Sequence, residues 1–329
     1  MIPLSILDLA PIVEGSDTAG ALRQSIALAQ HADGLNYQRF WVAEHHNMDG
    51  VASSATAVLI GQLAAATQRI RVGSGGIMLP NHAPLTIAEQ FGTLATLFPD
   101  RIDLGLGRAP GTDGPTMRAL RRHLDNSAED RFPEDVIELQ NYLAPARPGQ
   151  VVRAIPGQGT EVPIWLLGSS LYSAQLAAYL GLPFAFASHF APDLLMQALQ
   201  IYRSSYRPSS RHPQSYAMVA LNLIVADSDA EAAMLLTSLQ LRFLGMQRGQ
   251  RGPLPRPVDS MEGRWNAQEK AGVERMLAET IAGSPASVRA GLQATMQRTG
   301  ADEFIVACAV HDNQAKLHSY SLLDGLNQD

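Results

Sequence analysis

The chain has 329 residues, 46% of them apolar, and a single cysteine, so we expect a folded protein without an internal disulfide in a reducing, cytoplasmic setting. Its 25 basic and 31 acidic residues give a formal charge of −6, which leaves no basic surplus for binding a nucleic-acid backbone. The opening MIPLSILDLA lacks the charged region of a secretory signal, and no apolar run approaches the roughly 18–20 residues that span a bilayer, so we expect no membrane segment.

The first half of the chain predicts four units in which a short apolar strand precedes a helix. The strands are expected at residues 4–9, 39–44, 69–78 and 101–107. The helices after them are expected from about 22 to 34, at 53–66, at 84–98 and around 130–143. Gly34 and Pro99 mark the ends of the first and third helices, because glycine favours a helix end and proline cannot continue a helix. The Gly- and Pro-rich stretch 109–115 leads from the fourth strand to its helix.

The second half of the chain continues the same alternation. Further strands are expected at residues 163–167, 184–187, 216–226 and 303–310. Their helices are expected at 170–180, from about 191, from a cap at Asp227 or Ser228, at 283–300, and up to about 324. The segment 246–265 is too rich in Gly, Pro and Arg for a regular element. We expect it to be a mobile loop within one domain of residues 1–329, because the pattern continues on both sides.

Eight strand–helix units predict an α/β protein, a (β/α)₈ TIM barrel with insertions. An open doubly wound sheet is the rival architecture. Such sheets often bind dinucleotides at G-x-G-x-x-G, and the nearest stretch here, GLGRAPG at 105–111, has Pro110 in place of the third glycine. We therefore favour the barrel.

In a barrel of this kind the active site lies at the carboxyl ends of the strands. The polar or glycine-rich positions just after the expected strands, or within them, are therefore the candidates. They are Asp8, Glu44, His45, His46, the glycines of GSGG at 73–76, Arg108, the serines of GSSLYS at 168–173, and His189. Several of them indicate one kind of ligand.

A phosphate site is predicted where the fourth and fifth strands end. Ser169, Ser170 and Ser173 lie at the start of a helix whose first N–H groups have no intrahelical partner. Arg108 directly follows DLGLG and can bind a pair of phosphate oxygens with its planar guanidinium. The alternatives are that a serine only caps the helix and that Arg108 pairs with a carboxylate such as Asp113. Taken together, the two features favour a phosphorylated cofactor or substrate.

Two further stretches bear on the chemistry. Gly73, Gly75 and Gly76 weaken the third strand, which indicates either a flat ligand close to bare backbone or a bulge. His45 and His46 are neighbours on an extended chain and cannot both face the cavity, so a metal site, and with it a metal-dependent hydrolase, is disfavoured. We expect one histidine to act as a donor or acid–base group, while the other and Glu44 hold the strand end.

At these residues the chain resembles the bacterial luciferase-like flavin monooxygenase family, in its single-chain subgroup. The matching stretches are WVAEHHN, RIRVGSGGIMLPNHAPLTIAEQF, RIDLGLGRAPGTD, PIWLLGSSLYSAQLAAYLGLPFAFASHF and the GSP…DEFIV ending. This resemblance covers essentially the whole chain. It implies a barrel that binds reduced FMN, which reacts with O₂ to give a flavin peroxide that oxidises a small organic substrate, aldehyde-like or other.

The resemblance also implies roles for individual residues. His45 is similar to the family's catalytic histidine, and Gly75 and Gly76 fall where the family has a non-prolyl cis peptide beneath the flavin ring. Arg108, Ser170 and Ser173 match the family's phosphate contacts. Ser169 stands where the light-emitting enzyme has a glutamate, and Gly107 stands where it has a reactive cysteine, so light emission is not expected. The loop 246–265 corresponds to a segment that closes over the flavin in relatives.

The resemblance leaves other functions open. Some relatives bind the deazaflavin F420 and transfer hydride without O₂, and others bind flavin without turnover. Because the chain has no nicotinamide fingerprint, we expect a separate NAD(P)H:flavin reductase to supply reduced FMN. The small residues of 53–68 permit close helix packing, and we expect a homodimer.

Overall fold

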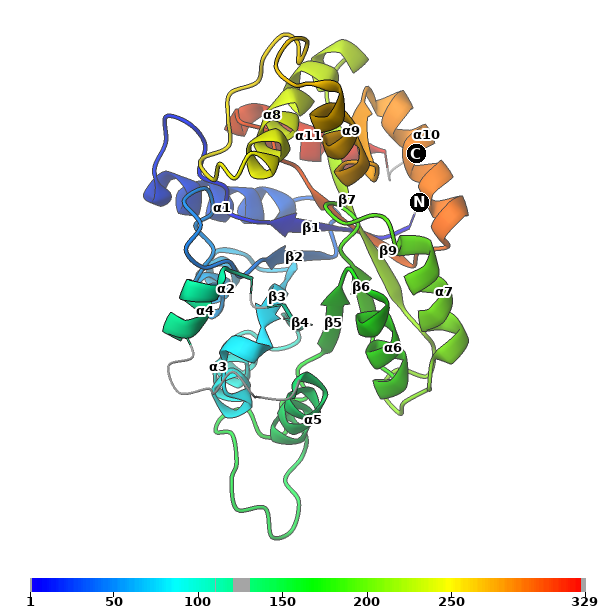
Figure 1. Cartoon of the computed structure of the whole chain (residues 1–329). Coiled ribbons are helices and arrows are strands. Elements are labelled where there is room, and N and C mark those ends of the chain that lie inside the picture. The colour runs from blue at the N-terminus through cyan, green and yellow to red at the C-terminus, as the bar shows by residue number, and fades with distance from the viewer. Residues whose placement is uncertain (1, 110, 121–130, 327–329) are drawn as a thin grey trace.

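The structure, a computed structural model, is a closed barrel of parallel strands surrounded by helices (Figure 1). It describes residues 2–109, 111–120 and 131–326. Eight strands form the closed ring, in the order β1, β2, β3, β4, β5, β6, β7 and β9, with β9 paired to β1. The predicted (β/α)₈ TIM barrel is therefore confirmed.

The ring strands agree closely with the expected ones. They are β1 (Leu4–Asp8), β2 (Arg39–Val42), β3 (Arg71–Met78), β4 (Ile102–Gly107), β5 (Ile164–Gly168), β6 (Phe184–Phe186), β7 (Ala217–Val225) and β9 (Glu303–Ala307). All of the strand pairs are parallel. A parallel sheet with both faces covered needs strands that are apolar throughout, and β1, β4, β7 and β9 are buried at every position.

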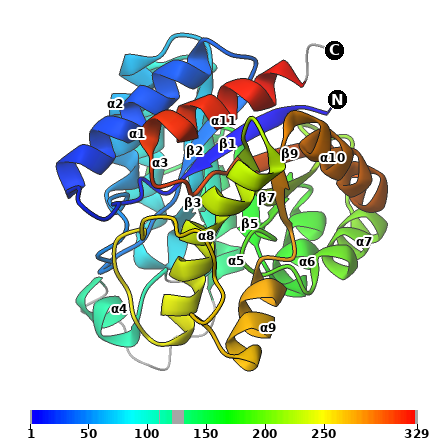
Figure 2. The same ribbon diagram turned by 90° about the horizontal axis from the view of Figure 1, so that it is seen from above.

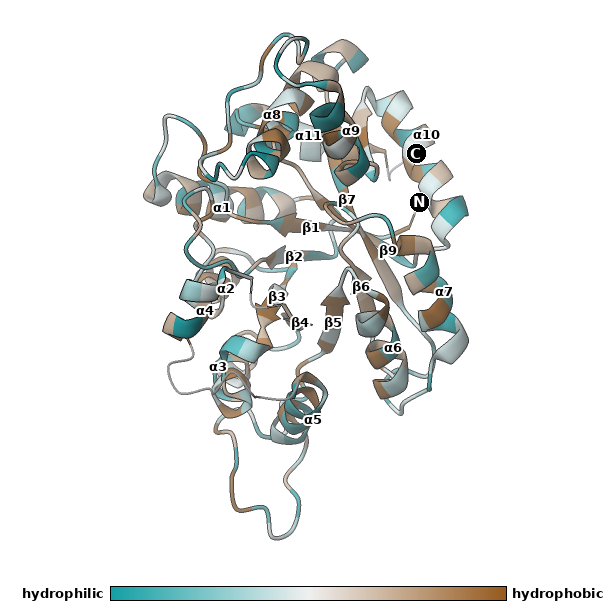
Figure 3. Cartoon of the chain, viewed as in Figure 1, coloured by the Kyte–Doolittle hydropathy of each residue, from teal (hydrophilic) through white to brown (hydrophobic). Residues whose placement is uncertain are grey.

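Helices follow the strands and cover the outside of the barrel. They are α1 (Thr18–Asp33), α2 (Thr56–Ala66), the short 3₁₀ helix η1 (Leu79–Asn81), α3 (Pro84–Leu97), α4 (Gly114–Leu120), α5 (Phe132–Leu143), α6 (Leu171–Leu180), α7 (Leu195–Ser205), α8 (Asp229–Gln247), α9 (Ala267–Met276), α10 (Pro285–Thr299) and α11 (Asn313–Gly325). Figure 3 shows hydrophobic residues along the strands and hydrophilic ones on many outward helix positions and loops. No helix in the described ranges combines the length and the apolar character that crossing a bilayer requires.

Several expected helix ends are confirmed by their geometry. Ser228 caps α8, because its side chain accepts a hydrogen bond from the backbone N–H of Glu231 at 3.2 Å. Gly181 ends α6 in the left-handed conformation with φ of 63°, which glycine adopts without steric cost. The helix expected around 130–143 is α5, although position 130 lies outside the described residues.

Four described elements were not predicted from the sequence, the short 3₁₀ helix η1 among them. The strand β8 (Thr280–Gly283) pairs with the carboxyl-terminal half of β7. Its four residues are too few to show a clear alternation of apolar and polar side chains. The helix α4 begins inside the Gly- and Pro-rich stretch that we expected only to connect a strand to its helix. The helix α9 begins with a capping box in which Asn266 and Glu269 bond each other's backbone N–H, a readable signal that we did not use.

An ionic and aromatic layer closes the amino-terminal end of the barrel. Arg39 donates hydrogen bonds of 2.8 Å to both Asp103 and Glu303, whose side chains are fully buried. Its guanidinium lies 4.8 Å from the ring centre of Trp165, which meets Trp41 edge to face at 5.3 Å. This layer forms a rigid floor, so a ligand can enter only from the opposite end.

Candidate functional site

The candidate site lies at the carboxyl ends of the strands, which we call the mouth of the barrel. Figure 1 looks toward this end, and Figure 2 shows that α4, the loop 248–266 and α9 gather on the same face. The loop is anchored there: Leu254 forms a parallel bridge with Val13, and the N–H of Val258 donates to the Thr237 hydroxyl at 2.8 Å. The residues to which the family resemblance gives roles lie in the strands that end at this mouth or soon after them: His45, Gly75, Gly76, Arg108, Ser169, Ser170 and, in the first turn of α6, Ser173.

The ends of β4 and β5 bring Arg108 to the start of α6. The guanidinium carbon of Arg108 lies 4.2 Å from the ring centre of Tyr172, a cation–π contact. Gly107, just before Arg108, pairs with Leu167 of β5, so strand pairing itself fixes this proximity. Asp113, the alternative partner, is instead contacted by Thr116, Asn47 and Arg251.

The serines at the start of α6 do not act as a side-chain cap. Ser170 occupies the N-cap position, but its hydroxyl makes no capping hydrogen bond and lies 3.4 Å from the hydroxyl of Ser173. A Cβ added at Gly168 would lie 2.2 Å from the Ser173 hydroxyl, so glycine is required for this close packing. The hydroxyls and the first N–H groups of α6 can therefore bind an anion beside Arg108. Ser169 is partly buried on the same turn.

The glycines that were expected to expose bare backbone lie in β3, which is the neighbour of β4 in the barrel. The peptide bond between Gly75 and Gly76 is cis, and the register of β3 against β4 shifts here. A Cβ on Gly76 would lie 2.7 Å from the carbonyl oxygen of Gly105. A Cβ on Gly75 would lie 2.7 Å from the end of the Leu7 side chain and 3.2 Å from Trp41. Protein atoms thus fill both Cβ positions, so close strand packing and the irregular register of β3, the bulge alternative, account for glycine here.

Glu44 holds the ends of β2 and β3 together, as the sequence predicted. One oxygen lies 2.8 Å from Nε2 of His46 and 2.9 Å from Nε2 of His82, and the other accepts from the N–H of Met78 at 3.0 Å. Burial alone would raise the pKa of Glu44, but the hydrogen bond and charge of His82 and the hydrogen bonds of His46 and the Met78 N–H lower it overall. Glu44 is therefore an ionised structural residue. His82 was not foreseen, because it lies 38 residues away in sequence.

Both imidazoles are committed to the same carboxylate oxygen and do not converge on an empty position. Within the described ranges, no group of three or more His, Cys, Asp or Glu side chains is arranged to hold a metal ion. The Glu44 cluster is therefore a hydrogen-bonded brace for the rim of the mouth.

His45 lies nearer the centre of the mouth, together with His189. His45 follows β2 and His189 follows β6, and these strands are four places apart in either direction around the ring. The two imidazoles nevertheless interact, since burial and, to a smaller extent, the charge of His45 together lower the pKa of His189 to about 4. Burial also lowers the pKa of His45, against a backbone hydrogen bond with Gly111 that raises it. Nδ1 of each ring is buried and has no hydrogen-bond partner among the described residues.

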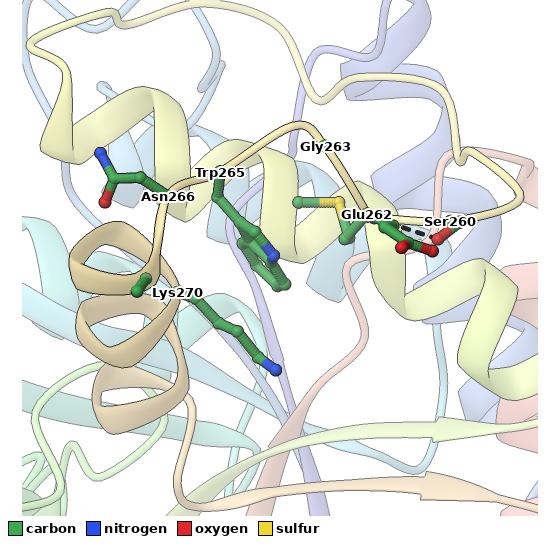
Figure 4. A pocket seen from close by; sticks show the side chains of 8 residues that line it. Ser260, Glu262, Gly263, Trp265, Asn266 and Lys270 are labelled. Carbon is green, nitrogen blue, oxygen red and sulfur yellow. Dashed lines mark hydrogen bonds between the residues drawn. The ribbon is translucent and has the colours of Figure 1, made fainter.

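A separate hollow lies between the loop and α9. It has a volume of about 530 Å³ and is lined by eight residues between Ser260 and Lys270, none of them a predicted site residue. Figure 4 shows that Trp265 and Lys270 extend toward the same side, whereas the Glu262 backbone donates to Ser260 at 3.0 Å. Trp265 also packs against the apolar cluster that joins the loop to α8. The loop and α9, which line this hollow, lie on the same face of the molecule as the mouth.

Comparisons with known proteins agree with this geometry. The family model described as luciferase-like monooxygenase matches residues 2–303. A protein of Escherichia coli (strain K12) named luciferase-like monooxygenase is 55% identical over 321 residues, covering 98% of this chain and 96% of that protein. The crystal structure of apo-MsnO8 is 36% identical, has a TM-score of 0.93, and covers 100% of this chain and 99% of that chain. An N-acetyl-S-alkylcysteine monooxygenase of Bacillus subtilis (strain 168) is 41% identical over 221 residues, 64% of each chain.

More distant structures share the fold alone. One is a type II Baeyer–Villiger monooxygenase in complex with FMN, at 18% identity and a TM-score of 0.73, covering 98% of this chain and 97% of that chain. Another is an F420-dependent secondary alcohol dehydrogenase, at 12% identity and a TM-score of 0.67, covering 100% of this chain and 99% of that chain. The same barrel thus serves enzymes of both cofactor types.

Proposed function

Because the chain belongs to the luciferase-like monooxygenase family, we propose that it is a flavin-dependent monooxygenase that uses reduced FMN and O₂ to oxidise a small organic substrate. The observation that carries this proposal is the contact of Arg108 with Tyr172 at 4.2 Å, which puts a cation beside the uncapped start of α6. Met78 at the end of β3 pairs with Gly107 at the end of β4. The cis peptide between Gly75 and Gly76 therefore lies on the strand next to the one that Arg108 follows. A phosphate and a flat ring of one molecule suit these two features.

The residues present fit FMN. Arg108, Ser169, Ser170 and Ser173 would hold its phosphate with charge, hydroxyls and helix N–H groups. The cis peptide between Gly75 and Gly76 would lie beneath its ring, as the family resemblance implies. When bound, reduced FMN supplies the two electrons with which O₂ is activated to oxidise the substrate.

His45 supplies the proton chemistry in this proposal. Because burial lowers its pKa, the imidazole is mostly neutral near pH 7 and can accept a proton. Its Nδ1 has no protein partner in the described ranges, so this atom is available to substrate or cofactor. In this proposal the loop 248–266 closes this side of the mouth and excludes water from the reaction.

Parallel titrations with FMN and F420 test the cofactor, since both carry a phosphate that could lie beside Arg108. We expect FMN to bind more tightly. Reduced FMN bound to the protein is then mixed with O₂ and a panel of aldehydes and thioethers in a stopped-flow instrument. The thioethers include N-acetyl-S-alkylcysteines, after the name of one relative. Oxidation of a panel member supports the monooxygenase. Tighter F420 binding, or bound flavin that oxidises nothing, would contradict it.

We also propose that a separate reductase supplies the reduced FMN. The chain with FMN and NAD(P)H alone should oxidise no substrate, and addition of an NAD(P)H:flavin reductase should start turnover. Oxidation of NAD(P)H by the isolated chain would contradict this arrangement.

A homodimer is proposed through α2 and its neighbour α3. Val58, near the start of α2, is 76% exposed, and Leu97, the last residue of α3, is 64% exposed, so each helix presents an apolar side chain to solvent. The molar mass from light scattering should correspond to two chains, and Val58→Glu should halve it. A wild-type monomer at micromolar concentration would exclude the dimer.

A further inference from the structure

Arg242 is a cation with no hydrogen-bond or ion-pair partner among the residues that the structure describes. It lies in α8, in the run MLLTSLQLRFLGM at 234–246, where it is the only charged residue. No hydrogen bond or ion pair joins it to any other described residue, and its side chain is mostly covered by protein. Burial lowers its pKa, and no carboxylate offsets that effect. Desolvating a charge in this way costs several kcal/mol unless a partner compensates.

The location of Arg242 follows from its electrostatic interaction with His45. Its charge lowers the pKa of His45, so the guanidinium lies within electrostatic reach of the residue that follows β2. Since α8 follows β7, the side chain must extend over the ends of β9 and β1 to reach that point. His189 interacts with the same His45 from the far side of the ring. Its interaction with His45 therefore groups Arg242 with both histidines.

Within the described part of the chain, no acceptor is bonded to Arg242. Glu44, the carboxylate next to His45, is committed to His46, His82 and the Met78 N–H. One turn earlier on the same face of α8, Ser238 is fully buried and its hydroxyl also has no partner among the described residues. A cluster of hydrogen-bond donors without an acceptor matches a ligand that brings negative charge.

Arg108 and Arg242 lie on different sectors of the barrel, so we expect them to bind different anionic groups. Arg108 lies at the ends of β4 and β5 beside α6, whereas α8 packs against β7 and β8 on another sector of the barrel (Figure 1). The FMN phosphate is assigned to Arg108 in the proposed function, so Arg242 remains for a different group. The planar fork of a guanidinium fits a carboxylate bidentately.

We propose that Arg242 binds a carboxylate of the organic substrate, so that the substrate class is a small organic acid with its oxidisable group held near His45. This proposal rests on the proposed function for the reaction that follows binding. The binding step itself depends only on residues of this chain: Arg242 holds the carboxylate, and the unpartnered hydroxyl of Ser238 lies one turn away on α8.

Calorimetric titration with hexanoate and hexanamide tests the proposal, because these probes have equal chain length and differ in charge. Both are titrated into protein with and without oxidised FMN. We expect hexanoate to bind wild-type protein at least ten-fold more tightly than hexanamide. Arg242→Met should weaken hexanoate at least ten-fold and change hexanamide less than two-fold, and Arg242→Lys should fall between. Arg23→Met, an equal loss of charge at an exposed position of α1, should change neither.

Four results would overturn the proposal. Hexanoate could show no advantage over hexanamide in the wild type, or could bind Arg242→Met unchanged. Arg242→Met could lose FMN affinity while keeping hexanoate, which would assign the residue to the cofactor. It could also melt at a lower temperature than the wild type, which would mark Arg242 as structural. Failure of FMN to bind the wild type would reject the proposed function instead, and the titrations without FMN would still decide the role of Arg242.

Discussion

Replacing His189 by Asn should make the protein less sensitive to acid. His189 is held in the mouth with its Nδ1 buried and unpartnered, and burial followed by the charge of His45 brings its pKa to about 4. The ordinary pKa of 6.5 applies once the chain unfolds. Between these two values the unfolded state binds the proton and the folded state does not, so stability falls as the pH falls.

The size of this effect follows from the two pKa values. Above pH 7.5 the group contributes nothing to the pH dependence, because it is neutral in both states. By pH 5 the unfolded form is mostly protonated and the folded form is not, which costs the native state about 2 kcal/mol. By pH 4 and below, the loss approaches its limit of about 3 kcal/mol.

Urea unfolding of the wild type and His189→Asn at pH 8, 6 and 5 measures this loss. The difference in free energy of unfolding between pH 8 and pH 5 should be about 2 kcal/mol smaller in the variant. His318→Asn, at an exposed position of α11, serves as a control that retains the wild-type loss. Equal losses in the wild type and His189→Asn would show that His189 is not held neutral, and the interpretation of the mouth as a desolvated cavity would be wrong.

Three other variants test separate parts of the structure. His45→Ala should slow substrate oxidation about 10²–10⁴-fold at unchanged FMN affinity, and unchanged kinetics would remove its proposed acid–base role. Gly76→Ala puts a Cβ 2.7 Å from the Gly105 carbonyl oxygen. It should lower the free energy of unfolding by about 1–3 kcal/mol and weaken FMN binding, whereas wild-type stability would refute the close strand approach. Glu44→Gln should cost about 1–3 kcal/mol in urea unfolding, because two imidazoles and the Met78 N–H lose a charged acceptor; no loss would contradict the brace.

The barrel could be predicted from the sequence because each strand is a short apolar run and each helix has its own end signals. Gly181 and Ser228 were readable as helix ends, since their roles depend on a few neighbouring residues. The strand β8 was not readable. Its four residues become a strand only because β7 extends beyond its pairing with β6 and offers a free edge.

In the candidate site, too, some residues could be predicted from the local sequence and others depend on tertiary contacts. Arg108 and the serines of α6 could be proposed because the residue after a barrel strand faces the mouth wherever the strand ends. The role of His82 depends on packing against Glu44 across 38 residues of sequence, which no local pattern shows. Arg242 lies in the middle of a helix, where a lone cation in an apolar run is an ambiguous sign. Its meaning came only from the absence of a partner among the described residues and from its position beside His45.

The central claim is that Arg108 and the start of α6 together bind the phosphate of the cofactor. Fluorescence titration with FMN and with riboflavin, which lacks only the phosphate, tests it directly in the wild type and in Arg108→Met. We predict that the wild type binds FMN at least ten-fold more tightly than riboflavin and that Arg108→Met loses this preference while its riboflavin affinity is unchanged. Equal binding of FMN and riboflavin by the wild type, or a preference that persists in Arg108→Met, would contradict the account.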